Sequence, residues 1–531
     1  MSSPLAMPDV FHIYDTTLRD GNQQEGMHLS VTDKLRIARL LDELGVNFIE
    51  GGWPAMVAGD EDFFKSAATE LELRNAKLVA YGRTREPGLT CENDPALAKL
   101  VEANTEVVCL VAKAHDVHVY DALRTTLEEN LAMVDETVRY LVGLGKRVFV
   151  DLEHFFDGYK ANPTYAMAVL RKAAEAGAEV VVLCDTNGGM LPHDMGDIVS
   201  AATQVGVDLG VHCQNDSGCA VANSMSALDA GVMHVQGTIN GYGERSGNVD
   251  LTTVIANLQL KYKWQVISPG QLGMLTSISN SIAEIAHQPL NPRQPFVGHS
   301  AFAHKAGLHA KAVQINENLY QHVDPRAVGN STHMVISEMA SRASVQVKGE
   351  ELGLDLSDRK VADQVAKLVK QRESKGYSYD LADASFELLV LDYLDQLELP
   401  FQVVSWKVVS EDDGSEENSV SEASVKLIAN GLREGVISVG NGPVNALGQA
   451  LVQALSGEYP FVKSYSLTDY KVRILDMEAG TDAVVRVMIV TTDGETTWTT
   501  LGVGTDVIEA SWEALADAYH YGLMKGYGSN K

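Results

Sequence analysis

The stretch from Asp15 to Gln23, DTTLRDGNQ, combines a carboxylate and a guanidinium within one turn. It follows a short apolar run that ends at Tyr14, so we expect it to begin a loop at the end of a β-strand. Asp20 is a hard oxygen donor suited to a divalent cation, and Arg19 carries a permanent charge that can polarise a carbonyl or hold a carboxylate. An isolated arginine–aspartate pair is more often a solvated surface pair. The complete string, placed at the start of a long α/β pattern, favours chemistry instead.

Two later segments could complete a site of this kind. HCQND, residues 212 to 216, ends an apolar run, so the side chains of His212 and Gln214 point to the same side of a strand and could share one metal ion with Asp20. A single histidine at a strand end is more often a structural hydrogen-bonding group. GTINGYGERSGN, residues 237 to 248, does not match the GxGxxG spacing, so we interpret it as a close-packed loop over a site rather than a phosphate cradle.

The elements that must position these residues are eight apolar, β-branched runs separated by helical patterns. Glycines stand one to three residues before several of the runs, at Gly45, Gly145, Gly177 and Gly231, as expected where a helix stops in the left-handed conformation. The pattern predicts a parallel (β/α)8 TIM barrel, with an open doubly wound sheet as the alternative. The runs are 11–14, 46–49, 77–81, 107–111, 147–150, 180–184, 209–211 and 234–239.

Polar residues gather just after the ends of these runs. In a barrel all eight ends meet at one mouth, where an active site is built from several strands at once. Convergence of this kind is difficult to explain by eight unrelated solvated loops. The residues concerned are Asp15, Arg19, Asp20, Glu50, Arg83, Lys113, Asp151, Glu153, Asp185, Thr186, His212, Gln214, Asn215, Asp216, Asn240, Glu244 and Arg245.

Together these motifs resemble the acyl-CoA condensing enzymes with a TIM-barrel metal site, the isopropylmalate, homocitrate and citramalate synthase family. The resemblance covers nearly the whole chain. IEGGWP (49–54), DLEHFFDGY (151–159), LCDTNGG (183–189) and VGHSAFAHKAGLHAKAV (297–313) are most similar to the citramalate synthase branch. The family pattern at 212–214 is HxH, and here Gln214 replaces the second histidine.

The resemblance implies a role for each matching residue. Arg19 would polarise the keto group of a 2-oxo acid, Glu153 would be a site carboxylate, and His309 would be delivered from outside the barrel, in the family often by the partner subunit. The residues implied in substrate binding are Gln23, Trp53, Asp151 and Thr186. Those implied at the metal are Asp20, His212, Gln214 and Asn240.

The activity that the resemblance implies is a metal-dependent Claisen condensation of acetyl-CoA with pyruvate, giving (R)-citramalate and CoA at the start of a threonine-independent route to isoleucine. An amide in place of imidazole makes the ligand set harder, so Mg²⁺ or Mn²⁺ is favoured, with Zn²⁺ possible as the ion. Glu153 and His309 are both candidates for the general base. The alternatives are the same chemistry on another 2-oxo acid, a lyase on the same barrel, and an effector-binding protein whose catalytic site has decayed.

Beyond the barrel, expected over residues 1–270, we predict a helical connector over 271–395 and a regulatory domain over 396–531. The last part contains an internal repeat: VGNGPVNALGQALVQAL from Val439 and VGTDVIEASWEALADAY from Val503 align at an offset of 64, so each copy is expected to consist of strands followed by one helix. This half resembles the regulatory domain of the same family. The resemblance implies a homodimer and an amino-acid effector, isoleucine by analogy with the branch.

Composition narrows the possible partners and compartment. A formal net charge of −29 over 531 residues argues against binding to nucleic acid or to an anionic membrane, and no apolar run approaches a membrane span. The N-terminus lacks the features of a secretory leader. The five cysteines are an odd number without CxxC spacing, which is typical of reduced thiols. We therefore expect a soluble cytoplasmic protein.

Overall fold

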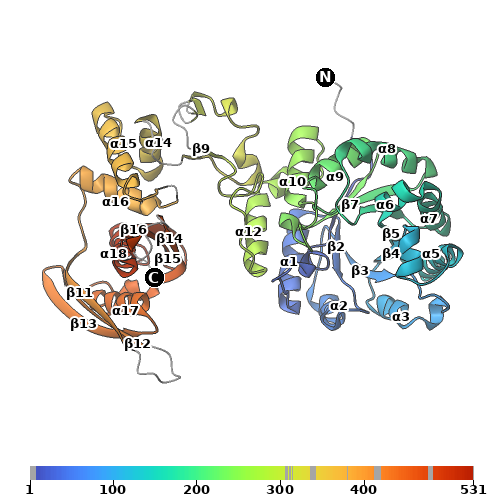
Figure 1. The fold of residues 1–531 in the computed structure, drawn as a ribbon, viewed down its shortest axis with the longest axis horizontal. Coiled ribbons are helices and arrows are strands. Elements are labelled where there is room, and N and C mark those ends of the chain that lie inside the picture. The colour runs from blue at the N-terminus through green and yellow to red at the C-terminus, as the bar shows by residue number, and fades with distance from the viewer. Residues whose placement is uncertain are drawn as a thin grey trace. The chain divides into compact units, whose positions relative to one another are not determined.

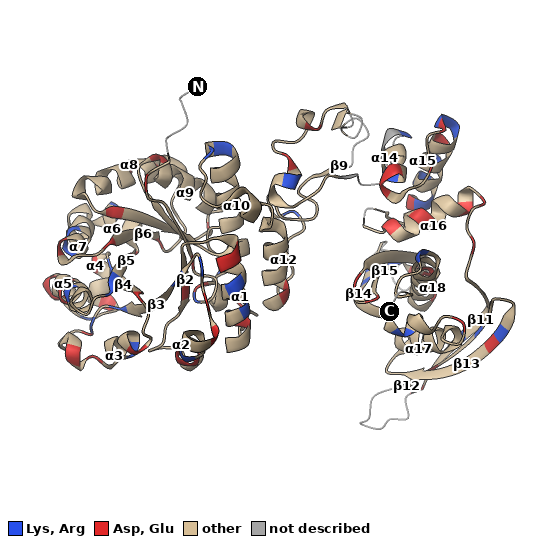
Figure 2. Ribbon diagram, turned by 180° about the vertical axis from the view of Figure 1, so that it is seen from behind, with Lys and Arg blue, Asp and Glu red and all other residues tan. Residues whose placement is uncertain are grey.

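The structure is a computed structural model that describes residues 7–304, 309, 312–313, 315–334, 342–379, 381–411, 420–475 and 482–529. Its contacts divide the chain into two units, each described by itself below. The first unit comprises Met1–Phe302 with His322–Ser331, and the second comprises Ala303–Gln321 with Thr332–Lys531. Figure 2 shows acidic and basic residues interspersed along the helices of both units, in keeping with a chain whose excess charge is negative. None of the described helices is both long enough and apolar enough to cross a membrane.

The first unit is a closed barrel of eight parallel strands in sequence order, with β1 paired to both β2 and β8 (Figure 1). The predicted TIM barrel is therefore confirmed, and the open sheet is excluded. All eight strands lie at the predicted runs. They are β1 His12–Asp15, β2 Phe48–Gly52, β3 Lys77–Arg83, β4 Val107–Lys113, β5 Arg147–Glu153, β6 Val180–Asp185, β7 Asp208–Cys213 and β8 His234–Gly237.

Helices surround the barrel (Figure 1). The apolar face that each helix turns toward the strands is buried. Two of them, α1 and α7, end at Gly45 and Gly177 with φ of 91° and 102°, the left-handed conformation that favours glycine. These helix stops were predicted from the glycine spacing. The helices of the unit are α1 Val31–Leu44, α2 Ala58–Glu70, α3 Pro95–Glu102, α4 Asp116–Asp121, α5 Leu127–Gly143, α6 Phe155–Ala161, α7 Pro163–Ala176, α8 Pro192–Ala202, α9 Ala220–Asp229, α10 Leu251–Asn257, α11 Pro269–Leu272 and α12 Leu275–Ile285.

The interior of the barrel is filled with side chains below the mouth. Tyr14, Phe48 and Phe149 are among a buried inner cluster, with Phe48 and Phe149 packed edge to face at 5.0 Å between ring centroids. Because this cluster closes the barrel from beneath, only the carboxyl ends of the strands remain for a site.

The second unit begins with a two-stranded sheet and three helices. These are β9 Ala303–His304, β10 His333–Met334, α14 Arg342–Leu352, α15 Arg359–Glu373 and α16 Asp383–Tyr393. A buried cluster that includes Val365, Val369 and Phe386 holds α15 and α16 together.

The remainder of the second unit is the predicted repeat, each copy consisting of three antiparallel strands and one helix. Both copies carry a bulge between their first two strands, at Val403/Ser405 and at Leu467/Asp469, and these positions are separated by the same 64 residues that separate Gly440 from Gly504. Alanines at every fourth position of the two helices are buried. The elements are β11 Phe401–Glu411, β12 Val420–Ala429, β13 Leu432–Gly440, α17 Pro443–Leu455, β14 Ser466–Ile474, β15 Val485–Thr492, β16 Thr497–Gly504 and α18 Val507–Lys525.

Candidate active site

The strand ends of the barrel enclose a cavity of about 130 Å³. Most residues that the sequence analysis proposed for a site line it, and they come from β1, β5, β6 and β7 and from the loops that follow. The lining residues among those proposed are Arg19, Asp20, Gln23, Asp151, Glu153, Thr186, His212 and Gln214. Tyr81, Val111, Cys184, Glu244 and Arg245 complete the wall.

Arg19 is held from two sides at the edge of this cavity. Its Nε donates to Glu50 Oε1 at 2.5 Å, and its guanidinium carbon lies 3.9 Å from the ring centroid of Tyr81. Glu50 is fully buried and also accepts hydrogen bonds from the hydroxyl groups of Tyr14 and Thr16. Burial alone would lower the pKa of Arg19, but the carboxylates of Glu50 and Asp20 raise it above its ordinary value. The result is a fixed cation, and within the described part of the chain its Nη atoms make no hydrogen bond.

A second group of four side chains meets beside Arg19. Asp20 Oδ2 lies 3.3 Å from His212 Nε2, which in turn lies 2.7 Å from Asn248 Oδ1. Gln214 Nε2 is 3.2 Å from the same Asn248 oxygen and 3.5 Å from Asp20 Oδ2. All four residues are buried. We call Asp20, His212, Gln214 and Asn248 the four-residue group.

The charges of this group are strongly coupled. Burial would raise the pKa of Asp20, but Arg19 and then His212 lower it well below its usual range. Burial would lower the pKa of His212, but its contact with Asp20 raises that pKa to about 9. In the protein alone the two residues therefore form a buried ion pair.

The composition of the four-residue group fits a divalent cation. It offers a carboxylate, one imidazole nitrogen and two amide oxygens, a set typical of Mg²⁺ or Mn²⁺ sites. Gln214 Oε1 is buried and has no hydrogen-bond partner among the described residues, so an acceptor is left unused at this point. Rotating the amide by half a turn would direct that oxygen toward Asp20 and Asn248, where a bound cation would replace the two hydrogen bonds that Gln214 Nε2 makes.

Asn240, proposed from the sequence as a residue near the metal, does not lie in this group. Its Nδ2 donates to Tyr242 Oη and to the Ser279 carbonyl, and its Oδ1 accepts from Ser279 Oγ at 2.6 Å. The residue has a left-handed backbone with φ of 61°, which directs its side chain against α12. Asn248 lies in the group instead, because a single β-bridge to Gln214 brings the end of the loop back to this point.

The other proposed catalytic and substrate-binding residues of the barrel fall into two sets. Thr186 Oγ1 accepts from the His154 backbone amide at 2.8 Å, and Glu153 forms an ion pair with Lys113. Asp151 accepts from Gln236 at 2.9 Å, and burial, followed by repulsion from Glu50, raises its pKa to about 6. Trp53 forms the second set, because it lies outside the cavity at the barrel mouth.

Trp53 does not line the 130 Å³ cavity. It borders an adjacent cavity of about 400 Å³, where its ring packs edge-on against Tyr81 at 5.2 Å. Trp53 therefore supports the residue on which Arg19 stacks.

A second acidic cluster lies deeper in the barrel, where ligand atoms of Glu50, Cys109 and Asp151 come within 4.8 Å of one another. Both Glu50 oxygens already accept hydrogen bonds, and one of them is the partner of Arg19. Asp151 likewise accepts from Gln236 and from the Cys109 thiol. The side chains of the deeper cluster therefore hold Arg19 and Gln236, whereas the four-residue group keeps one buried oxygen, Gln214 Oε1, without a partner among the described residues.

Comparison with known proteins decides the family. An (R)-citramalate synthase of Streptomyces coelicolor is 52% identical, with 99% of each chain covered. The (R)-citramalate synthase of Aquifex aeolicus is 46% identical over 98% of this chain and 99% of that protein. This chain belongs to the (R)-citramalate synthase family. A 2-isopropylmalate synthase of Methanocaldococcus jannaschii is more distant, at 29% identity over 98% of this chain and 96% of that one.

Family models divide the chain in a way that suits an (R)-citramalate synthase family member. The HMGL-like model matches residues 10–282, which include the whole barrel. The homocitrate synthase post-HMGL domain-like model matches 296–376, and the LeuA allosteric (dimerisation) domain matches 380–523. The resemblance inferred from the motifs is thereby confirmed.

His309, the remaining proposed catalytic residue, belongs to the second unit. Its ring stacks on Tyr320 with 4.1 Å between centroids, and much of the surrounding segment lies outside the described residues. Its delivery to an active site remains a prediction.

Proposed function

We propose that this protein condenses acetyl-CoA with pyruvate to form (R)-citramalate and CoA. The observation that carries the choice of 2-oxo acid is the size of the cavity at the barrel mouth, about 130 Å³. Tyr81 and Val111 form part of its wall, and Arg19 stacks on Tyr81, so the wall cannot retreat without displacing the cation. A three-carbon acid suits such a space better than a branched or dicarboxylic one.

We further propose that the four-residue group binds a divalent metal ion, with Mg²⁺ or Mn²⁺ favoured over Zn²⁺. The ion would supply a Lewis acid that polarises the keto group of the 2-oxo acid and orients its carboxylate. Binding would use Asp20 and His212 together with the side-chain oxygens of Asn248 and Gln214, and it would require the proton on His212 to leave.

The remaining roles fall to side chains that are already fixed. Arg19 would stabilise the negative charge that develops on the keto oxygen, because its orientation is set before the reaction by Glu50 and Tyr81. Thr186 would hold the substrate carboxylate, and Gln23 lines the same cavity.

A base must remove a proton from the acetyl methyl group before the carbon–carbon bond forms. Glu153 is one candidate, because it lines the cavity and forms an ion pair with Lys113. His309 is the other candidate and would come from the partner subunit of a homodimer. The new bond joins the methyl carbon to C2 of pyruvate, and water then cleaves the thioester, so one water is consumed for each CoA released.

Release of free CoA from acetyl-CoA, measured with a panel of 2-oxo acids, tests this proposal. Pyruvate should give the highest kcat/KM, ahead of 2-oxobutyrate, 2-oxoisovalerate and 2-oxoglutarate. Arg19→Lys should lower kcat by about 10²-fold, since lysine keeps the charge but loses the planar fork. Preference for a branched or dicarboxylic acid would contradict the choice of pyruvate, and no release with any acid would contradict the activity itself.

We infer that the repeat in the second unit binds an amino-acid effector, isoleucine by analogy, and joins two subunits. A cavity of about 650 Å³ lies between the two copies, lined by tyrosines, apolar side chains and amides that include Tyr470, Asn445 and Gln449. Isoleucine should raise the melting temperature of the full chain and inhibit CoA release, because a ligand that binds only the folded state stabilises it. No effect of isoleucine, valine or leucine at millimolar concentration would leave the repeat as a dimerisation element alone.

Two further assignments concern the roles of the domains and the cellular compartment. We propose that residues 1–270 are catalytic, 271–395 connect, and 396–531 regulate. We also place the protein in the cytoplasm, since the five cysteines are free thiols and four of them are buried.

A further inference from the structure

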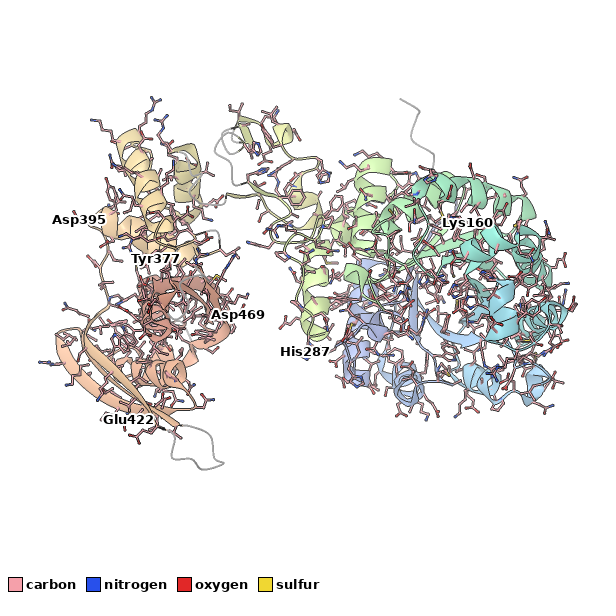
Figure 3. The ribbon with its side chains drawn as sticks, in the orientation of Figure 1. Lys160, His287, Tyr377, Asp395, Glu422 and Asp469 are labelled. Atoms are coloured by element: carbon pink, nitrogen blue, oxygen red, sulfur yellow. The ribbon has the colours of Figure 1, made fainter. Side chains whose placement is uncertain are left out.

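A charged cavity of about 190 Å³ lies in the second unit, separate from the neutral cavity between the two copies of the repeat. It is bounded by the end of α15, by α16, by β16 and by α18, so it joins the helical segment to the second copy of the repeat. Tyr377, labelled in Figure 3, marks its position in the segment between α15 and α16. Four leucines, two tyrosines and Ser385 line part of the wall, and the charged residues Arg372, Asp392, Glu513 and Asp517 line the rest.

One carboxylate of this cavity is already committed to the protein. Glu513 Oε1 accepts from Tyr377 Oη at 2.7 Å, and Glu513 Oε2 accepts from the Val503 backbone amide at 2.9 Å. These two bonds fix the carboxylate at the cavity wall. Its negative charge has no cation within ion-pair distance among the described residues.

A second carboxylate, Asp517, stands one helical turn further along α18. Asp517 lines the cavity, is half-buried, and forms no hydrogen bond or ion pair within the described part of the chain. Burial, and then repulsion from Glu513, raises its pKa to about 7. Two carboxylates four residues apart on one helix face repel each other, so a positive charge between them would be stabilising.

The cavity also contains a cation, Arg372, which opposes the rise in the pKa of Asp517 without cancelling it. The guanidinium carbon of Arg372, near the end of α15, lies 5.0 Å from the ring centroid of Tyr377. Within the described residues Arg372 makes no ion pair, although it lines the same cavity as Asp517 and Glu513. A guanidinium and carboxylates therefore line the same small cavity without forming an ion pair across it among the described residues.

We propose that this cavity binds a small zwitterion that carries a primary ammonium group and a carboxylate, in the manner of an α-amino acid. The ammonium group would lie between Asp517 and Glu513, and the carboxylate would meet Arg372 in the paired geometry that guanidinium favours. The leucines, which include Leu388 and Leu501, would cover an apolar side chain. The inference does not depend on the proposed catalytic activity.

Such a ligand would add to the contacts that already join the helical segment to the repeat, among them the hydrogen bonds of Leu501 to Ser385 and of Tyr521 to Glu387. Arg372 belongs to the helical segment, whereas Asp517 and Glu513 belong to the last helix of the repeat. Occupancy would therefore stiffen the link between the helical segment and the repeat. The neutral 650 Å³ cavity has no charged residue among its lining residues, so it offers a different kind of site.

Isothermal titration of the full-length protein with L-alanine, L-valine and L-leucine tests the proposal. Each amino acid is compared with its N-acetyl derivative, which lacks the ammonium group, and with its amide, which lacks the carboxylate. At least one free amino acid should bind, and both of its derivatives should bind at least about tenfold more weakly, because each loses one charge-assisted contact.

Substitutions locate the site. Asp517→Asn and Arg372→Gln should each weaken binding by about tenfold or more, whereas Gln453→Ala, which changes the neutral cavity, should leave it unaltered. Asp517→Asn should also raise the melting temperature of the ligand-free protein near pH 8, since it removes an uncompensated carboxylate while keeping its shape. Arg372→Lys, which keeps the charge, should restore part of the affinity that Arg372→Gln loses.

Three outcomes would overturn the inference. The first is that no amino acid of the panel binds at about 10 mM, where even a weak site would be populated. The second is that an N-acetyl derivative or an amide binds as tightly as the free amino acid. The third is that Gln453→Ala abolishes binding while Asp517→Asn preserves it, which would place the ligand in the neutral cavity.

Discussion

Gln214 Nε2 lies 3.2 Å from Asn248 Oδ1, and the bridge between these residues brings the loop after β8 back to the end of β7. Gln214 occupies the position where the family pattern has a histidine. Its buried oxygen Oε1 has no hydrogen-bond partner among the described residues, so under the proposed metal binding the identity of the ion should depend on Gln214.

Gln214→His should increase the affinity for Zn²⁺. Imidazole is a softer donor than an amide oxygen. The affinity of the variant for Zn²⁺ should therefore be about tenfold or more higher than that of the wild type, with a smaller change in the affinity for Mg²⁺. The measurement is metal content and Zn²⁺ titration after treatment with a chelator. Equal Zn²⁺ affinity in the two proteins would mean that residue 214 does not contact the metal.

Asn248→Ala should weaken Mn²⁺ binding by about 10- to 100-fold, because it removes one oxygen and releases the contacts of His212 and Gln214. Asn240→Ala is the matched control, since Asn240 bonds to Tyr242 and Ser279 instead. Binding of Mn²⁺, followed by its paramagnetic resonance signal, distinguishes the two variants. A larger loss in Asn240→Ala would return the role to that residue.

Glu50→Gln should lower kcat by about 10- to 100-fold, with little change in the KM for acetyl-CoA. The amide keeps the shape of Glu50 but weakens the charged hydrogen bond that orients Arg19. Glu106→Gln, an exposed carboxylate just before β4 at the opposite end of the barrel, is the control and should leave kcat unchanged. Equal kcat in all three proteins would show that Arg19 needs no support from Glu50.

His520 should make the protein sensitive to acid. Burial lowers its pKa to about 4, and its ring stacks on Phe401 at 3.9 Å between centroids. The unfolded chain takes up this proton near pH 6.5 and the folded chain only near pH 4, so stability falls as the pH decreases through this window, by about 3 kcal/mol in total.

Replacing the histidine should remove this effect. His520→Gln should show a smaller loss of melting temperature between about pH 6.5 and pH 4 than the wild type, although it loses the ring stack at every pH. If the melting temperatures of the two proteins fall by the same amount across this pH range, His520 is not the source of the acid sensitivity.

The barrel could be predicted from the sequence because its signals are local. Each run of β-branched residues, and each glycine stop such as Gly45 or Gly177, acts within a few residues of itself, and the closure of eight such units is a property of the fold class. The convergence of Arg19 and His212 follows from closure alone, since strand ends share one mouth. The repeat could be recognised in the sequence because matching residues of its two copies lie 64 positions apart.

The rest depends on contacts between distant segments. Asn240 and Asn248 are both amides of one loop, and only the left-handed backbone of Asn240 and the bridge to Gln214 decide which faces the site. The stack of Arg19 on Tyr81 joins residues 62 positions apart, and Tyr81 reads in the sequence as an ordinary strand residue. No local sequence pattern predicts either contact.

Mass analysis of the product formed from pyruvate and acetyl-CoA labelled with ¹³C in both acetyl carbons tests the proposed activity most directly. The account predicts citramalate that carries both labelled carbons, formed in equal amount to the free CoA and dependent on Arg19. CoA release that yields labelled acetate without citramalate would mean that the site hydrolyses the thioester but makes no carbon–carbon bond, and it would contradict the proposed condensation.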